Sequence, residues 1–118
     1  MSESLECPPI DLAHLAQYTG GDARLDAEVL QLFSSQCGTT LERLESFLDG
    51  PDTNAWREAA HSLKGAASGI GAFAIVEMAG RAESANPDAD HEKAADCLAR
   101  LRESCEVVQA FIASYVKA

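Results

Sequence analysis

Three residues near the middle of the chain, His61, Lys64 and Gly65, have types and spacing suited to phosphoryl chemistry. A neutral imidazole is a good nucleophile near neutral pH, and a lysine ammonium group can hold phosphate oxygens as a point charge. On a helix, Gly65 would lie directly beside His61 and leave open space next to the imidazole. Glycine costs about 1 kcal/mol relative to alanine in a helix interior, so its presence here indicates a functional reason.

The helix that must carry these residues is amphipathic. At about 100° per residue, its apolar face holds Trp56, Ala59, Ala60, Leu63, Ala66, Ala67 and Ile70. Its other face holds Arg57, Glu58, His61, Lys64, Gly65 and Ser68. We therefore expect His61 to point away from the core. The alternative is an ordinary surface histidine beside an incidental lysine. The coincidence of the His, the Lys, the costly Gly and a ridge of small residues weakens that alternative.

This segment resembles the signature of histidine-containing phosphotransfer (HPt) domains. That signature reads approximately His-x-Leu-Lys-Gly, two small residues, two variable residues, an aliphatic residue and Gly. The matching residues are His61, Leu63, Lys64, Gly65, Ala66, Ala67, Ile70 and Gly71. Ala66-Ala67 replaces the Ser often found there, and Gly69 adds flexibility before Ile70. The resemblance implies a helical fold, a receiver-domain partner and transfer of a phosphoryl group through His61.

Length, composition and charge fit one helical domain. The chain has 118 residues, and its aromatic content of 6% together with abundant alanine favours helices over sheets. The formal net charge of −10 makes nucleic acid and anionic membranes poor partners. Because the start from Met1 to Pro9 is polar and acidic, we expect no signal peptide, and no apolar run is long enough for a membrane span. We expect a cytoplasmic monomer, and the start at Met1 without a flanking linker fits a free-standing protein.

Apolar periodicity predicts five helices, at residues 12–18, 23–48, 53–69, 73–85 and 91–116. The expected N-caps are Asp11, Asp22, and Asp52 or Thr53. The segments that end or break the helices are Thr19-Gly20-Gly21, Asp49-Gly50-Pro51 and Asn86-Pro87-Asp88. Gly38 could kink or divide the second helix. We expect one helix because Leu41 lies eight residues past Phe33, in register with the stripe. The residues expected to face inward include Leu12, Leu15, Ala16, Leu25, Leu32 and Phe73.

These helices predict an all-α fold, an antiparallel up-down four-helix bundle with a short extra N-terminal helix. No run alternates with the period of a strand. We expect the bundle domain to cover residues 11–118 and residues 1–10 to form a flexible N-terminal arm. The domain is long enough to bury a core without disulfides or metals.

A helical hairpin centred near Ala72 would place Glu83 opposite His61, because each lies eleven residues from the turn, about 15 Å along its helix. A carboxylate that accepts the Nδ1–H bond would fix the tautomer and leave Nε2 as the nucleophile. In HPt domains the corresponding position is often Glu or Gln in this role, which the resemblance extends to Glu83. The alternative is a solvated glutamate paired with a nearby Lys or Arg.

The resemblance also implies a docking surface around His61, on the second and third helices, for the short helix of a receiver domain. Its candidate partner-binding residues are Arg57, Glu58, Gly65, Ser68 and Ala72. Gly65, Ser68 and Ala72 would permit close approach, and Ser68 could also hydrogen-bond a bound phosphate or a partner. Arg57 could meet an acidic partner or remain a solvated charge, and Arg81 is a further candidate for the rim of the site. His14 and His91 have no supporting neighbours, and no chemistry is assigned to them.

The leading hypothesis is a phosphorelay intermediate that takes a phosphoryl group from a receiver aspartyl phosphate, or from a histidine kinase system, onto His61 and passes it to a response-regulator aspartate. The expected partners are receiver domains of response regulators, of hybrid histidine kinases, or of both. Lys64 would balance the added charge. The chain has no P-loop or glycine-rich phosphate cradle, so we expect a phosphoryl carrier that is no enzyme and binds no cofactor, with Mg²⁺ on the receiver. A second hypothesis is a helical adaptor or inhibitor that holds a receiver or a kinase and transfers nothing.

A metal centre is not expected, because metal-binding bundles use a pair of Glu-x-x-His motifs on two helices and this chain has only one, from Glu58 to His61. The four cysteines, Cys7, Cys37, Cys97 and Cys105, lack zinc-finger spacing. We expect them to be reduced and partly buried as small apolar residues. A zinc site from His91 and Cys97 is the remaining alternative.

Overall fold

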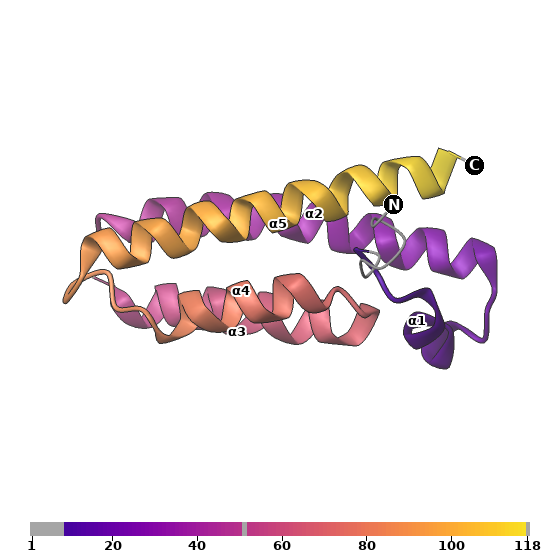
Figure 1. Ribbon diagram of the computed structural model, residues 1–118, viewed down its shortest axis with the longest axis horizontal. Helices are drawn as coiled ribbons and strands as arrows, with labels where there is room; N and C mark the ends of the chain where they lie inside the picture. Colours follow the sequence, from indigo (N-terminus) through magenta and orange to yellow (C-terminus); the bar gives the residue numbers. More distant parts are fainter. Residues whose placement is uncertain (1–8, 51, 118) are drawn as a thin grey trace, which may run out of the picture.

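The computed structural model describes residues 9–50 and 52–117, and all regular structure in these residues is helical. The five helices are α1 (Leu12–Thr19), α2 (Ala23–Leu48), α3 (Thr53–Ile70), α4 (Phe73–Ser84) and α5 (His91–Lys117) (Figure 1). Their bounds agree with the prediction to within one residue at each end. α2 continues through Gly38 as one helix, as its uninterrupted stripe predicts.

The four long helices form a bundle in which α2 and α5 lie side by side and α3 and α4 form a hairpin across from them (Figure 1). α3 packs on α2, and α4 packs on α5, which closes the bundle. α1 lies at the end of the α3–α4 hairpin and contacts α2 and α3. The predicted four-helix bundle with a short extra N-terminal helix is confirmed. No helix of the described residues is long and apolar enough to cross a membrane.

Side-chain caps set the starts of four helices. The carboxylates of Asp11, Asp22 and Asp52 accept hydrogen bonds from backbone N–H groups in the first turns of α1, α2 and α3, and the Asp90 carboxylate does the same in the first turn of α5. These bonds satisfy donors that have no partner inside the helix. Ala72 provides no such side-chain bond to α4; that helix begins directly after the turn that ends α3.

The turn between α3 and α4 requires glycine at Gly71 for two reasons. Its φ of 82° lies in the left-handed region, where residues with a Cβ are strained. A Cβ there would also lie 2.9 Å from the backbone oxygen of Asp11. The N–H of Asp11 donates a 3.0 Å hydrogen bond to the Gly71 carbonyl. This close contact holds the start of α1 against the tip of the hairpin.

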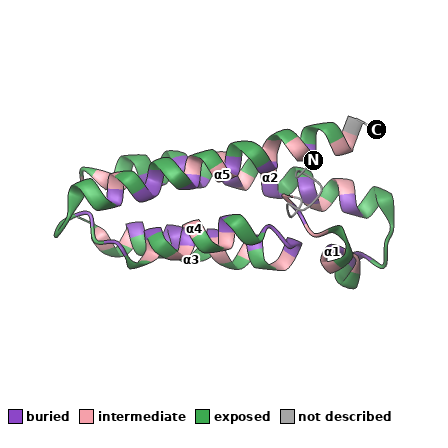
Figure 2. Ribbon diagram, viewed as in Figure 1, coloured by how far each residue is buried: buried purple, intermediate pink, exposed green. Residues whose placement is uncertain are grey.

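The core lies between the four long helices, whose buried residues face one another (Figure 2). Five of the nine buried residues of α3 and α4 are alanines: Ala59, Ala60, Ala67, Ala79 and Ala82. Small side chains let two helix backbones approach closely. The α3–α4 hairpin is therefore tight enough for side chains at its outer edge to reach from one helix to the other.

Several burial predictions require correction. Leu12 and Leu25 are each 39% exposed, Phe73 is 49% exposed and Leu32 is 72% exposed. The inward stripe of α2 runs through Leu30, Phe33, Cys37, Leu41 and Leu44, and Leu32 lies outside it. Leu12, Leu25 and Phe73 lie in the first turns of their helices, where fewer neighbours cover them. Leu15 is buried, as expected.

The cysteines and the predicted N-terminal arm are only partly within the described residues. Cys37, Cys97 and Cys105 are free and buried, as expected for small apolar residues, and Cys7 lies outside the described residues. Ile10 is completely buried in the core, so it is not part of a loose arm. Residues 1–8 of the predicted arm lie outside the described residues.

Candidate functional site

α3 presents His61 on the outer face of the hairpin. The amphipathic pattern of this helix buries Trp56, Ala60 and Leu63 completely and leaves His61 toward solvent. The His61 side chain is 68% exposed. A partner can therefore reach the imidazole without any rearrangement of the core.

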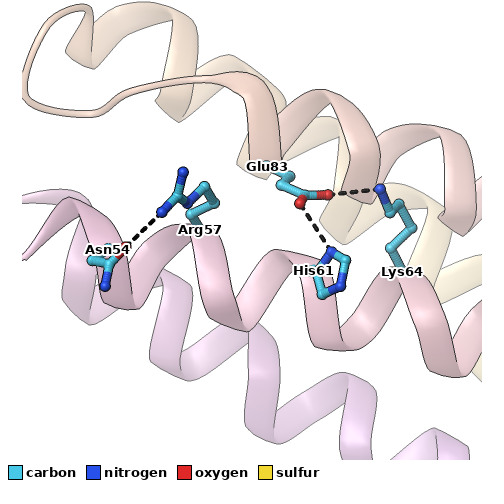
Figure 3. A network of polar contacts seen from close by, with 5 residues as sticks. All are labelled: Asn54, Arg57, His61, Lys64 and Glu83. Carbon is cyan, nitrogen blue, oxygen red and sulfur yellow. Dashed lines mark hydrogen bonds and ion pairs between the residues drawn. The ribbon is translucent and has the colours of Figure 1, made fainter.

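Glu83, in the last turn of α4, connects His61 to Lys64. One carboxylate oxygen, Oε2, lies 2.9 Å from Nδ1 of His61, and the other, Oε1, lies 2.8 Å from Nζ of Lys64 (Figure 3). The predicted contact between Glu83 and His61 is thus present. The alternative, a glutamate paired with a nearby lysine, is present as well, because the carboxylate makes both contacts at once. The second ring nitrogen of His61 lies on the side of the ring away from Glu83 (Figure 3).

The charge environment keeps Glu83 ionised. The Lys64 ammonium group donates a hydrogen bond that lowers the pKa of the Glu83 carboxyl below its usual range, and the bond with His61 lowers it further, while partial burial opposes both. An ionised carboxylate offers only acceptors. Nδ1 of His61 must therefore carry the hydrogen of this bond, and a neutral ring then has its lone pair on Nε2.

The space around the imidazole is open on α3. A Cβ built on Gly65 would meet nothing within 4 Å, and Ser68, one turn further along, is also exposed. The exposed residues Arg57 and Glu58 precede His61, and Nη2 of Arg57 donates a 2.7 Å hydrogen bond to Oδ1 of Asn54 (Figure 3). Four of the five predicted docking residues, Arg57, Glu58, Gly65 and Ser68, are therefore accessible.

Ala72 is the exception, and its assignment to the docking surface is wrong. The residue is completely buried. Its N–H donates a 2.9 Å hydrogen bond to the carbonyl of Ala67, which draws it back onto the end of α3. The place where the chain turns is therefore covered, and Ala72 offers no surface for close approach by a partner.

A polar hollow of about 690 Å³ lies between the start of α3 and the end of α4. Its lining includes Arg57, Lys64, Glu83 and Asn86, but not His61. Gly80 also lines it, and a Cβ at Gly80 would lie 3.6 Å from Cδ of Lys64. Gly80 thus faces the stem of Lys64 where that side chain crosses to α4. The sequence motif did not indicate this glycine, because it lies on the other helix.

The other histidines lie elsewhere. Nε2 of His91 is 2.7 Å from Oδ1 of Asp49, which joins the end of α2 to the start of α5. His14 makes edge-on contacts with the rings of Tyr18 and Phe73. The described residues contain no group of three or more His, Cys, Asp or Glu side chains arranged to hold a metal ion. His91 and Cys97, the alternative zinc site, therefore belong to no metal-binding group among the described residues.

The helical bundle thus carries an exposed histidine whose Nδ1 contacts a carboxylate of the neighbouring helix. Comparison with protein families matches residues 28–111 to the Hpt domain. This match covers most of the chain, including α3 and α4, and the chain belongs to the Hpt domain family. No curated protein and no solved structure matches it. Hpt domains take part in histidine phosphotransfer in phosphorelays, act typically as phosphoryl carriers and generally interact with receiver domains.

Proposed function

We propose that this protein relays phosphoryl groups between receiver domains through Nε2 of His61. The observation that carries the proposal is the 2.9 Å contact between Nδ1 of His61 and Glu83 on a ring that is 68% exposed. This contact occupies one nitrogen and leaves the other with a lone pair toward solvent. Family membership supports the reaction class, and the geometry supports the choice of residue and atom.

The proposed uptake step is an in-line displacement. The lone pair of Nε2 attacks the phosphorus of an aspartyl phosphate on the receiver, and the bond to the aspartate oxygen breaks as the N–P bond forms. The aspartate leaves as a carboxylate. The ring of His61 keeps its Nδ1 hydrogen and gains positive charge, which the ionised Glu83 balances. Delivery to a second receiver is the reverse of this step with another aspartate as acceptor.

Lys64 has two successive partners in this proposal. Its ammonium group lies 2.8 Å from Glu83 when His61 is unmodified. A phosphoryl group on His61 adds negative charge beside it, and the flexible, partly exposed lysine stem allows Nζ to approach the phosphoryl oxygens. Lys64 would then neutralise charge on the group being transferred, while Glu83 remains with the ring.

The proposed partner surface is centred on His61 and includes Arg57, Glu58, Gly65 and Ser68. The open space at Gly65 supports close approach of a receiver helix to the imidazole. Mg²⁺ and the residues that bind it are assigned to the receiver. The contact is expected to be small and short-lived, as in other transient signalling encounters, because one domain must meet a donor and an acceptor in turn.

The proposal is tested by incubating the full chain with receiver domains that have been phosphorylated with acetyl phosphate. Phosphate uptake and return are followed at neutral pH on intact protein. The chain with acetyl phosphate alone controls for direct modification. We expect uptake by the wild type and by His91→Gln, whose histidine is also exposed, and none by His61→Gln. Receiver binding without any phosphate on the wild-type chain would contradict the relay and support an adaptor.

A further inference from the structure

The single tryptophan of the chain joins α3 to the last turn of α4. Nε1 of Trp56 donates a 2.7 Å hydrogen bond to the backbone carbonyl of Ala82. Both residues are completely buried. The bond is buried and joins positions 26 residues apart in the sequence. Ala82 immediately precedes Glu83, so this bond acts on the turn that carries the carboxylate.

The last turn of α4 needs such an anchor. α4 is only 12 residues long and ends at Ser84, one residue after Glu83. Carbonyl groups in the last turn of a helix have no partner one turn further on, and helix ends fray. The carbonyl of Ala82 accepts from Ala85 N–H at 3.1 Å and from the indole. Trp56 therefore supplies a bond from a different helix to a turn that has few of its own.

The same helix carries the nucleophile. Trp56 lies five residues before His61 on α3, so its bond to Ala82 sets the position of the α4 end relative to the residue that Glu83 must reach. We propose that Trp56 is a positioning residue, which holds the last turn of α4 on α3 so that Glu83 keeps the Nδ1–H tautomer of His61. This proposal rests on the proposed role of His61 and concerns the indole N–H, as distinct from the bulk of the ring.

The proposed role differs from that of an ordinary core residue in what it controls. A tryptophan that only fills space would affect stability, and an isosteric ring without the N–H would replace it without effect on His61. Loss of the N–H of a positioning residue, in contrast, changes the tautomer of His61 while the fold remains. The readout is therefore the pair of imidazole ¹⁵N chemical shifts of His61 in the ¹⁵N-labelled full chain at neutral pH, measured beside phosphotransfer.

Two variants remove the N–H. Trp56→Phe keeps an aromatic ring in a smaller volume. Because the chain has one tryptophan, biosynthetic replacement by benzothienylalanine changes position 56 alone and substitutes sulfur for N–H in a ring of nearly the same shape. This second variant decides the question if the smaller ring of Trp56→Phe prevents folding. Circular dichroism confirms the helical fold of each variant.

A matched control removes a similar bond far from His61. Nε2 of Gln109, on α5, donates a 3.0 Å hydrogen bond to the backbone carbonyl of Ser34 on α2. Gln109→Met therefore removes a side-chain donor to a carbonyl of another helix without touching the α3–α4 hairpin. Glu83→Ala removes the carboxylate itself and shows the full effect on the imidazole. Between them, these variants bracket the expected result.

With benzothienylalanine we expect the Nε2–H tautomer of His61 to become populated, phosphotransfer to slow by about tenfold, and the backbone amides near the end of α4 to exchange faster. Gln109→Met should leave all three unchanged. A folded benzothienylalanine variant with wild-type His61 shifts would overturn the proposal. If Glu83→Ala changes the tautomer but not phosphotransfer, the functional role of Glu83 fails, while the ¹⁵N shifts still decide whether Trp56 positions it.

Discussion

Oε2 of Glu83 lies 2.9 Å from Nδ1 of His61, although the two residues are 22 positions apart in the sequence and belong to different helices. The two-residue turn between α3 and α4 brings them to the same height on the hairpin, and the buried alanines bring the helices close enough for contact. The other oxygen of the same carboxylate holds Lys64. One side chain thus contacts both the histidine and the lysine of the motif.

Replacing Glu83 should separate hydrogen bonding from charge. Glu83→Gln keeps an acceptor oxygen for Nδ1–H, whereas Glu83→Ala removes it. We expect phosphotransfer to fall by about 10- to 100-fold in Glu83→Ala and by less than about tenfold in Glu83→Gln. Single-turnover transfer from a phosphorylated receiver measures both. Glu77→Ala is the control, because Glu77 is also on α4 but pairs with Arg81. Equal rates for Glu83→Ala and wild type would remove the orienting role.

The ion pair of Glu83 should contribute to stability only when its carboxyl is ionised. The pKa of this group is lower in the folded protein than in the unfolded chain, mainly because of Lys64. Its contribution is therefore complete above the ordinary pKa of glutamate and is lost as the pH falls through the lower, folded pKa. Since the pair is partly exposed, we expect less than about 1 kcal/mol.

Urea unfolding of the wild type and Glu83→Gln, repeated from about pH 7 to about pH 3, measures this dependence. The difference in unfolding free energy between the two proteins should shrink toward the acid end. A difference that stays constant over this range would show that the charge of Glu83 is not its source.

Substitutions at Gly65 should reduce the transfer rate by filling the space beside His61, and not by destabilising the protein. A Cβ at this position meets nothing, so Gly65→Ala should stabilise α3 by about 1 kcal/mol. Gly69→Ala, at another open position on α3, should do the same. Only substitutions at Gly65 should slow transfer, and Gly65→Gln should slow it more than Gly65→Ala, because a longer side chain lies against the imidazole.

Thermal unfolding and transfer rates, measured on the same preparations, test this comparison. If Gly65→Gln transfers phosphate as fast as Gly69→Ala, the open space beside His61 has no part in docking.

Gly71 should be intolerant of any side chain. Both a positive φ and a contact of 2.9 Å with Asp11 oppose a Cβ, so Gly71→Ala should destabilise the protein by about 2 kcal/mol or more. Gly20 also has a positive φ, of 70°, but open space around it. Gly20→Ala should therefore cost only about 1 kcal/mol. Urea unfolding measures both, and equal losses would show that the contact with Asp11 is unimportant.

Local sequence signals were sufficient to predict the helices and part of the site. Capping aspartates and glycines act within a turn, so the bounds of α1, α2 and α3 follow from Asp11, Asp22, Asp52 and Gly71. The Glu83–His61 contact was predictable because a short hairpin turn fixes the heights of residues on both sides. Likewise, the continuous apolar stripe of α2 predicted a single helix through Gly38.

Other features depend on packing that has no sequence pattern. The bond from Trp56 to the Ala82 carbonyl uses a backbone acceptor, which every residue has. The pairing of Lys64 with Glu83 depends on the conformation of a long side chain. The burial of Ala72 and Ile10 follows from how α1 and the hairpin tip meet, and the exposure of Leu32 from the limited width of the buried stripe.

The measurement that tests the account most directly identifies the phosphorylated atom. The wild-type chain is phosphorylated by a phosphorylated receiver, kept at neutral pH and analysed by ³¹P and ¹⁵N NMR, with mass spectrometry to locate the residue. We predict one phosphoryl group on Nε2 of His61, with the hydrogen retained on Nδ1 beside Glu83. A phosphoryl group on Nδ1 or on another residue, or no phosphorylation by any receiver tested, would contradict the account.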